Sequence, residues 1–477
     1  MKKRRSVPVY QRTSVPERLS FTGTLLHFLH WYTLLCYYIF AMLTALSPLD
    51  GRYHTKVLEL CENFSEQALM KARIEVEVRY FITLANEPKI RQLPKLKAKQ
   101  TKALLAIVDK FNSAQAAEVK KIERTTNHDV KAVEYYLKNK VEKIPGLKKQ
   151  VEFIHFGLTS EDVNNLAYGL MIHNALKASI RPNIKSAIAD LKKMANKWKK
   201  TPLLSLTHGQ SATPTTVGKE LMVFVDRLDR QLAQLNKFKM QGKFGGAVGN
   251  YAAAKIAYPE VKWEALGRRF VNSLGIQPMA NTTQINPHDD IAELSHILHR
   301  INIIMLDLSR DMWLYIMRSV LKQKVVAGEV GSSAMPHKVN PIDFENAEGN
   351  IGISNVLLSH FAEKLPVSRM QRDLSDSTVQ RNIGSAFGYH LVAVKSLRKG
   401  LSKVSVNPKV TKKELEEHCE VLAESIQMLL RKKGVKGAYE KLKKLTRGEK
   451  VTKEDLLDFM KKEKFSKDEV KRVMSLI

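Results

Sequence analysis

Apolar residues recur every three or four positions along much of the chain after about Met42. This spacing is typical of amphipathic helices, and it is clearest at residues 219–240 and 291–314. The apolar positions are Leu221, Phe224, Val225, Leu228, Leu232 and Leu235 in the first stretch, and Leu294, Ile297, Leu298, Ile301, Met305 and Leu308 in the second. Apolar stripes along long helices predict a helical bundle, which other subunits could complete. The chain is therefore expected to be helical throughout.

Turn-forming residues cluster in four short regions that we expect to be loops: 144–147, 201–214, 242–250 and 326–341. From about Ser402 the chain shifts to short amphipathic segments rich in lysine and glutamate, which indicate a small separate helical domain. Glycine (23 residues) and proline (16 residues) are both scarce for a chain of 477 residues. This scarcity favours long helices over many short strands.

Composition and cysteine content narrow the class of protein. Hydrophobic residues make up 44% and charged residues 26% of the chain, which excludes a wholly disordered protein. The three cysteines, Cys36, Cys61 and Cys419, are far apart and form no CxxC pair. This pattern argues against a disulfide scaffold and a thiolate zinc site, and it favours a reducing, cytoplasmic location.

The chain is strongly basic, with 78 Lys and Arg against 48 Asp and Glu and a formal net charge of +30. Such a charge suggests a nucleic-acid partner, but the excess is spread along the chain. No RNA-recognition, zinc-finger or basic-zipper motif accompanies it. Diffuse lysine is more typical of a solvated surface, and its field can attract a small substrate with several negative charges. We therefore expect a small anionic substrate rather than nucleic acid.

An apolar segment without charged residues occupies positions 25–46, downstream of basic residues at positions 2–5. It is long enough to cross a bilayer, which takes about 20 residues, and its basic flank is typical of a signal anchor. Two histidines inside the segment, and Met42 as a natural start, favour the alternative that residues 1–41 are an extension foreign to the folded protein. Any membrane segment would be confined to residues 1–46.

The polar loop at 328–341 has the most chemical content. Gly331 allows a tight turn beside Ser332, where consecutive backbone amides could hold a developing anion. Lys338 would add a charge and Asn340 would add hydrogen bonds. The alternative is an ordinary polar surface loop. The residues alone do not single out Ser332 as a base, because a free serine hydroxyl is a very weak acid.

Two histidines lie among small polar residues. His208 is followed by Gly209 in a loop ahead of a helix, and His128 is followed by Asp129, which could orient the imidazole. Histidine exchanges protons near neutral pH, since its ordinary pKa is about 6.5. Both are therefore candidates for acid–base chemistry, with a purely structural histidine as the alternative.

Other segments indicate the binding of anions. Thr159 and Ser160 precede two acids, as at a capped helix N-terminus, whose exposed amides can also bind anions. Arg372 and Arg381 suit carboxylate or phosphate recognition, although surface salt bridges would explain them nearly as well. No HxxxH, GxGxxG or GxxxxGK[ST] motif is present. This profile favours acid–base chemistry on an anionic substrate without a metal or other cofactor.

Several segments together resemble the fumarase/aspartase superfamily. GSSAMPHKVNP at 331–341 is similar to its signature loop, and the other segments are most similar to the bacterial type of adenylosuccinate lyase. They are ERTTNHDVKAVEYYLK (123–138), FIHFGLTSEDVNN (153–165), THGQSATP (207–214), NTTQINPHD (281–289) and LPVSRMQRDLSDSTVQR (365–381). The resemblance runs from about Met42 almost to the C-terminus.

The resemblance implies a mainly α-helical, three-domain subunit whose long central helices associate into a homotetramer with active sites shared between subunits. The domains would be 42–150, 151–401 (with the signature loop) and 402–477, after the extension at 1–41. It also implies elimination of fumarate from adenylosuccinate to give AMP, and the same cleavage of the succinyl-carboxamide ribotide of purine synthesis. No cofactor is implied.

By the same resemblance, His208 matches the general acid, which protonates the departing nitrogen. Ser332 matches the general base, which removes the proton β to that nitrogen, and His128 matches a histidine that assists at the phosphate or beside the acid. The remaining matches are substrate-binding positions: Arg52, Tyr53, Asn127, His128, Asp129, Thr159, Ser160, Gln284, Arg372, Ser377 and Arg381, with Lys338 and Asn340 expected at the succinyl carboxylates.

One departure and two alternatives stand beside this interpretation. Ser211 stands where the THGQ segment usually continues with proline, which could loosen the loop that holds His208. The signature loop is also compatible with another lyase of the superfamily, of the argininosuccinate lyase or fumarase type. A non-catalytic basic scaffold or nucleic-acid binder is the alternative from a different class, and the presence of both His208 and Ser332 argues against it.

Overall fold

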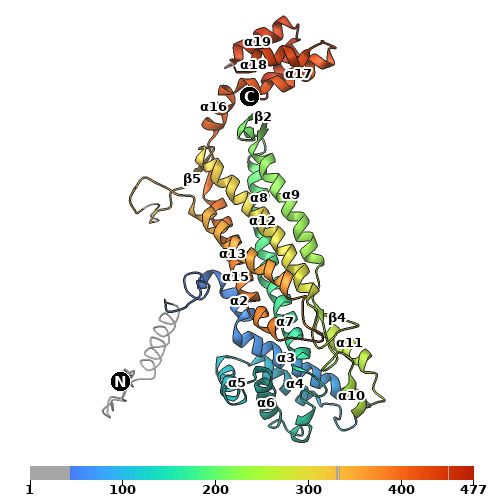
Figure 1. Cartoon of the computed structure of the whole chain (residues 1–477). Coiled ribbons are helices and arrows are strands. Elements are labelled where there is room, and N and C mark those ends of the chain that lie inside the picture. Colours follow the sequence, from blue (N-terminus) through green and yellow to red (C-terminus); the bar gives the residue numbers. More distant parts are fainter. Residues whose placement is uncertain (1–42, 329–330, 332, 449–450) are drawn as a thin grey trace, which may run out of the picture. The chain divides into compact units, whose positions relative to one another are not determined.

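The computed structural model describes residues 43–328, 331, 333–448 and 451–477. As predicted, the described residues are mainly helical (Figure 1). Two compact units are present, Met1–Thr55 and Lys56–Ile477. In the described part of the first unit, the chain turns so that the Tyr53 amide donates to the Pro48 carbonyl at 2.8 Å.

The apolar N-terminal segment lies almost wholly outside the described residues. Within the part that the structure describes, no helix combines the length and the apolar character needed to cross a membrane.

Among the helices that precede the bundle, α4, α5 and α6 pack against α3, which buries residues on nearly all sides. Their bounds are α2 (His54–Phe64), α3 (Glu66–Ala85), α4 (Ala98–Asp109), α5 (Ser113–Thr126), α6 (Asp129–Val141) and the 3-10 helix η1 (Lys148–Phe153). Two further helices, between α9 and α12 in the sequence, are α10 (Ala252–Ala257) and α11 (Trp263–Ser273).

Long helices form the central bundle, in which α13 packs against α12 and α15, and α9 packs against α8 and α12. Their bounds are α7 (Ser160–Ala175), the π-helix η2 (Leu176–Ile180), α8 (Arg181–Lys197), α9 (Val217–Lys237), α12 (Asp289–Met317), α13 (Ile342–Lys364), the short α14 (Ser375–Gln380) and α15 (Ile383–Ser402). The helix from α7 to α8 is continuous through η2. Pro182 is the second residue of α8, and its missing N–H accounts for a local change of helix type.

The apolar stripes predicted for α9 and α12 are confirmed. All six predicted positions of α12 are buried, and in α9 only Leu232 is less than fully buried. Helix α12 extends slightly beyond the predicted stretch at both ends.

The expectation of helices throughout was wrong at three two-stranded sheets. These are the antiparallel hairpin β1 (Pro202–Thr207) and β2 (Gln210–Thr216), the parallel pair β3 (Gln241–Gly242) and β4 (Gln277–Pro278), and the antiparallel pair β5 (Leu321–Gln323) and β6 (Val404–Val406). The predicted loop at 201–214 is therefore mostly a hairpin. Its β-branched threonines favour extended backbone, but this signal is weak without alternating apolar residues.

The C-terminal helices bury an apolar cluster of their own, centred on Leu422, Ile426, Leu430 and Leu456. Their bounds are α16 (Pro408–Glu417), the 3-10 helix η3 (Cys419–Leu422), α17 (Ala423–Lys432), α18 (Ala438–Thr446), α19 (Lys453–Lys462) and α20 (Lys467–Met474). The domain boundaries given above stay a prediction.

Candidate functional site

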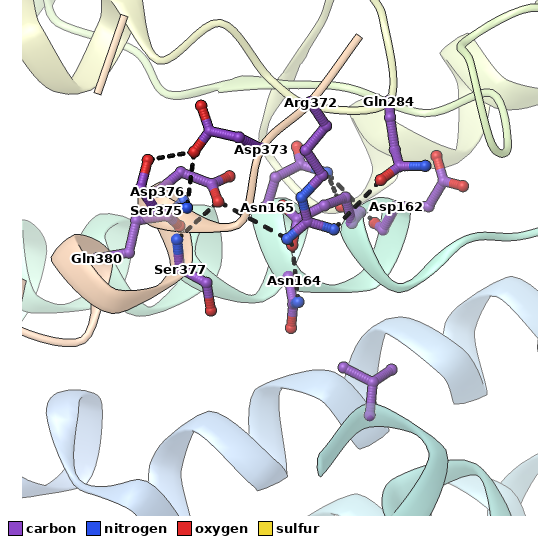
Figure 2. A network of polar contacts seen from close by, with 12 residues as sticks. Asp162, Asn164, Asn165, Gln284, Arg372, Asp373, Ser375, Asp376, Ser377 and Gln380 are labelled. Atoms are coloured by element: carbon purple, nitrogen blue, oxygen red, sulfur yellow. Dashed lines mark hydrogen bonds and ion pairs between the residues drawn. The ribbon is translucent and has the colours of Figure 1, made fainter. Parts of the chain in front are cut away.

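A hydrogen-bonded network at the N-terminal end of α7 unites residues from distant parts of the sequence. Its members are Arg73, Asp129, Thr159, Glu161, Asp162, Asn164, Lys243, Gly245, Gly246, Gln284, Arg372, Asp376, Ser377 and Arg381. We call it the α7 network. Within it, Arg372 Nη1 donates to Gln284 Oε1 at 3.3 Å, and Arg372 Nη2 donates to Glu161 Oε1 at 3.1 Å. Figure 2 shows the Arg372 side chain between Gln284 and Asp376, whose Oδ1 lies 3.7 Å from Arg372 Nη2.

Asp129 joins this network through two arginines. Arg73 Nη2 and Arg381 Nη2 each donate to Asp129 Oδ2 at 2.8 Å, and Arg73 Nε donates to Asn164 Oδ1 at 2.8 Å. Burial alone would raise the pKa of Asp129, but the two guanidinium groups hold it well below its usual value. Asp129 is therefore ionised and fixes Arg381 beside α7, while most of the guanidinium donors of the exposed Arg381 remain available to a ligand.

The α7 N-terminus itself is held by a buried carboxylate. Asp162 accepts from the Thr159 amide at 2.8 Å, as a capping residue does, and from the amides of Gly245 and Gly246 at 2.8 and 3.0 Å. Lys243 Nζ lies 2.7 Å from Asp162 Oδ1, and both side chains are 0% exposed. The predicted helix N-terminus at Thr159 is confirmed, and it is fixed to a distant glycine turn.

Buried polar atoms without a hydrogen-bond partner gather in the same place. In the described part of the chain they include Glu161 Oε2, His288 Nδ1, Arg372 Nε and Asp376 Oδ2. Burial also raises the pKa of Glu161 above its usual value, and Arg372 offsets only part of this effect. Unsatisfied buried groups are costly, so their clustering indicates a site that water or a polar ligand completes.

His128 and Asn127 lie directly before Asp129 at the α5–α6 corner. Asn127 ends α5 in the left-handed conformation, with φ of 50°. His128 caps α6, since its Nδ1 accepts from the Lys131 amide at 3.2 Å. With Nδ1 used as an acceptor, the neutral imidazole carries its proton on Nε2, on an exposed side chain that can donate to a ligand.

His208 lies far along the chain from this network, in the two-residue turn between β1 and β2. Thr207 pairs with Gln210, and the turn residues His208 and Gly209 have φ of 53° and 74°. Positive φ at both positions is the geometry of a tight hairpin turn, for which glycine is favoured. His208 is thus exposed at a hairpin tip rather than in an irregular loop ahead of a helix.

Only part of the signature loop is described. Asn340 Nδ2 donates to the Gly331 carbonyl at 3.0 Å, and a side chain at Gly331 would come within 2.1 Å of the Lys338 carbonyl oxygen. The loop therefore closes on itself at Gly331, where a larger residue does not fit, and Lys338 is exposed. Ser332, the predicted base, lies outside the described residues.

The α7 network and the His208 turn lie at opposite ends of one continuous helical rod (Figure 1). Segments α7, η2 and α8 contribute 16, 5 and 17 residues to it. At 1.5 Å per residue the rod is roughly 55 Å long. Thr159 precedes its first residue, and His208 follows its last, so a single chain does not bring the two to one substrate.

The structure thus brings together Asp129, Thr159, Gln284, Arg372 and Arg381, and it leaves His208, Lys338 and Asn340 apart from them. Ser377 joins through its amide, which donates to Asp376 Oδ1 at 2.7 Å. The Ser160 side chain makes no hydrogen bond to the network within the described residues. Arg52 and Tyr53 belong to the first unit, Met1–Thr55.

Sequence reasoning missed two of the network's charged residues, Arg73 and Lys243. The available signal for Arg73 was a charge among apolar residues of α3, where Met70 and Ile74 are buried beside it. Lys243 offered no comparable signal. Among the described residues, no group of three or more His, Cys, Asp and Glu side chains could hold a metal ion.

Comparison with known proteins identifies the family. Adenylosuccinate lyase of Haemophilus influenzae is 50% identical over 434 residues, which cover 91% of this chain and 95% of that protein. Adenylosuccinate lyase of Escherichia coli is 53% identical over 418 residues, which cover 88% of this chain and 92% of that protein. The chain belongs to the adenylosuccinate lyase family. Members are carbon–nitrogen lyases, and this assignment confirms the predicted activity.

Family profiles agree with this assignment, and solved structures share the fold. The family described as "Lyase" matches residues 51–357, and "Adenylosuccinate lyase C-terminal" matches residues 368–477. A β-carboxy-cis,cis-muconate cycloisomerase from Acinetobacter calcoaceticus has a TM-score of 0.67 at 17% identity and covers 87% of this chain and 93% of its own. A fumarate lyase from Mesorhizobium has the same TM-score at 18% identity, covering 88% and 90%. These structures show that the fold is shared.

Proposed function

We propose that the chain eliminates fumarate from adenylosuccinate to give AMP, and that it cleaves the succinyl-carboxamide ribotide of purine synthesis in the same way. The observation that carries this proposal is the α7 network. Four residues matched to substrate binding come from three distant parts of the sequence: Asp129, Gln284, and Arg372 with Arg381. Hydrogen bonds through Glu161, Arg73 and Asn164 link them.

In the proposed reaction, Ser332 removes the proton from the succinyl carbon β to the nitrogen. The electron pair left on that carbon is delocalised into the adjacent carboxylate and then forms the double bond of fumarate. The carbon–nitrogen bond breaks, and His208 gives its proton to the departing nitrogen of AMP. Positioned acid and base groups of this kind each contribute roughly 10²- to 10⁴-fold to rate.

The substrate's charges fit the proposed binding groups. Within the described residues the Arg381 side chain makes one hydrogen bond, to Asp129, so its remaining donors suit a phosphate or carboxylate. Lys338 and Asn340 would bind the succinyl carboxylates, where they stabilise the carbanion as negative charge moves onto the carboxylate. The net charge of +30 would raise the local concentration of such an anion.

We also propose that the active site is shared between subunits of a homotetramer. The rod from α7 to α8 separates the α7 network from His208 within one chain, whereas antiparallel neighbours would bring opposite ends together. The bundle also exposes large apolar residues that a subunit interface would cover: Val223 on α9, Ile303, Leu314 and Met317 on α12, and Ile353 and Val356 on α13. Exposed large apolar residues on several helices of one bundle suit an association surface.

The test is fumarate release, followed as loss of ultraviolet absorbance, by protein started at Met42 with each succinylated ribotide and no added metal. We expect turnover of both substrates by the wild-type protein. Ser332→Ala should lower kcat by about 10³-fold or more with little change in substrate binding, because it removes a group that acts only in the transition state. Ser333→Ala is the matched control and should retain most activity.

Two outcomes would contradict the proposal. Absence of turnover by folded wild-type protein would disprove the proposed function. Near-normal turnover by Ser332→Ala would show that Ser332 is not the base.

A further inference from the structure

The hairpin that carries His208 rests on the C-terminal helices. Helix α16 packs against β1, and η3 packs against β2. Beneath the hairpin, Leu204 of β1 lies in a buried apolar cluster with Leu415 of α16 and Val421 of η3. The base of the hairpin is thus fixed by apolar contact, whereas the turn itself projects beyond this cluster and is exposed.

Two polar contacts continue this support toward the turn. His418 Nδ1 lies 3.2 Å from Ser211 Oγ and 2.9 Å from Glu420 Oε1, and Thr213 Oγ1 donates to Glu424 Oε2. Because an ionised carboxylate only accepts, Nδ1 carries the proton, and the same N–H also reaches Ser211 Oγ. Glu420 therefore orients an imidazole that donates to the hairpin.

The contact between His418 and Ser211 is close to the reacting group. Ser211 lies three residues after His208 and pairs with Leu206 across the hairpin. Ser211 is also the position at which the THGQ segment departs from its usual proline. A proline restricts the backbone by itself, whereas a serine restricts it only if its side chain is held.

We propose that His418 is a positioning residue for the reaction, which holds the turn of the general acid His208 through its hydrogen bond to Ser211. This inference rests on the proposed role of His208. The hydrogen bond is partly exposed, so its effect on overall stability is small. Its effect on the reaction rate is larger, because a displacement of a catalytic group by about 1 Å can lower the rate up to about 100-fold.

The kinetic test compares His418→Ala, Ser211→Ala and the double variant. Each single variant should lower kcat about tenfold while KM changes less than about twofold, since the acid acts in the transition state and the α7 network binds the substrate. The double variant should lose no more than either single variant, because both substitutions delete one contact. Lys412→Ala is the control. Lys412 lies on α16, its side chain is 72% exposed, and the variant should keep wild-type kcat.

A proline variant distinguishes positioning from general damage. Thr207 and Gln210 flank the two-residue turn as a hydrogen-bonded pair, so the next pair, Leu206 and Ser211, is a non-hydrogen-bonded one. Ser211→Pro therefore removes no ladder bond. The Ser211→Pro variant should keep the wild-type kcat, and adding His418→Ala to it should not lower kcat further. If His418→Ala still lowered kcat tenfold in the Ser211→Pro protein, the proposal would be overturned.

Amide hydrogen exchange tests the contact without turnover. His418→Ala should speed exchange in the hairpin, residues 202–216, and leave the central bundle unchanged. Unchanged hairpin exchange, or wild-type kcat in His418→Ala, would also overturn the proposal. If the wild-type protein released no fumarate, the proposed function would fail while the exchange result still decided whether His418 holds the hairpin.

Discussion

In the core of the central bundle, His390 Nδ1 lies 2.7 Å from Asn302 Oδ1, and Asn302 Nδ2 donates to Ser354 Oγ and Asn355 Oδ1. The donated bonds fix the Asn302 amide, so its oxygen faces His390 and accepts from Nδ1. His390 Nε2 is buried without a hydrogen-bond partner in the described part of the chain. Burial accordingly lowers the pKa of His390 from 6.5 to about 4.

This shift predicts a pH dependence of stability. Between about pH 6.5 and 4 the unfolded chain binds a proton at His390 and the folded chain does not, so the free energy of unfolding falls as pH falls. Between pH 6.5 and pH 5 the titration of this residue should lower the free energy of unfolding by roughly 2 kcal/mol. His390→Asn keeps a donor near Asn302 and cannot titrate. The free energy of unfolding in urea should therefore depend less steeply on pH in the variant. If it fell equally with pH in both proteins, His390 would not be the residue that titrates.

Single residues also show where sequence reasoning reached its limit. Asp129 and Arg381 were identified by resemblance, but their contact spans 252 positions of sequence. Arg73, which bonds both Asp129 and Asn164, was not identified. A charged residue on a helix can be solvated or buried, and local pattern does not decide between them, because its partners are 56 and 91 positions away.

At the level of elements, the α7 N-terminus depends on one buried ion pair. Asp162 accepts three backbone amides and the Lys243 ammonium, so it joins α7 to the turn at Gly245 and Gly246. Lys243 in turn donates to the Gly246 carbonyl at 2.6 Å. The position of Thr159 therefore depends on the buried ion pair between Asp162 and Lys243.

Removal of one partner should cost more than removal of both charges. Lys243→Met leaves the Asp162 carboxylate buried and uncompensated, which should lower the free energy of unfolding by about 3–5 kcal/mol. Lys243→Met combined with Asp162→Asn removes both charges. The asparagine oxygen can keep the two amide bonds made to Oδ2, from Thr159 and Gly246, and only the bond from the Gly245 amide is lost. The double variant should therefore be more stable than Lys243→Met alone in urea unfolding. Additive destabilisation would contradict this account.

Elements differed in how well the sequence predicted them. Helices α9 and α12 were predicted because burial repeats every three or four residues, which is a local signal. The cap at Thr159 was also local, since its partner Asp162 is three residues away. The β1–β2 hairpin was missed because its strand β2, QSATPTT, has no apolar alternation. Its extended form depends on packing against α16 and η3.

For the whole molecule, the proposed site divides between two ends of the bundle. The α7 network surrounds the first turns of the rod from α7 to α8, and His208 lies beyond the last residue of the rod. A subunit that holds both groups has no working site by itself under this proposal. Each site would take its network from one subunit and its acid from another.

Mixed tetramers test this arrangement. We expect His208→Ala and Arg381→Ala each to be nearly inactive alone. If an active site takes the two residues from different subunits, random mixing of equal amounts places both intact residues together in roughly one quarter of the sites. Fumarate release by co-refolded protein should therefore recover to about a quarter of the wild-type rate. If both residues came from one chain, no site in the mixture would contain both.

The matched control pairs two variants of the same region. Arg372→Ala and Arg381→Ala both alter the α7 network, which a single chain supplies, since Arg372 bonds Glu161 and Arg381 bonds Asp129 in the same subunit. In their mixture every subunit carries one of the two substitutions, so no network is intact and no recovery is expected. Recovery in this pair, or none in the His208 and Arg381 pair, would contradict a site divided between subunits along the rod.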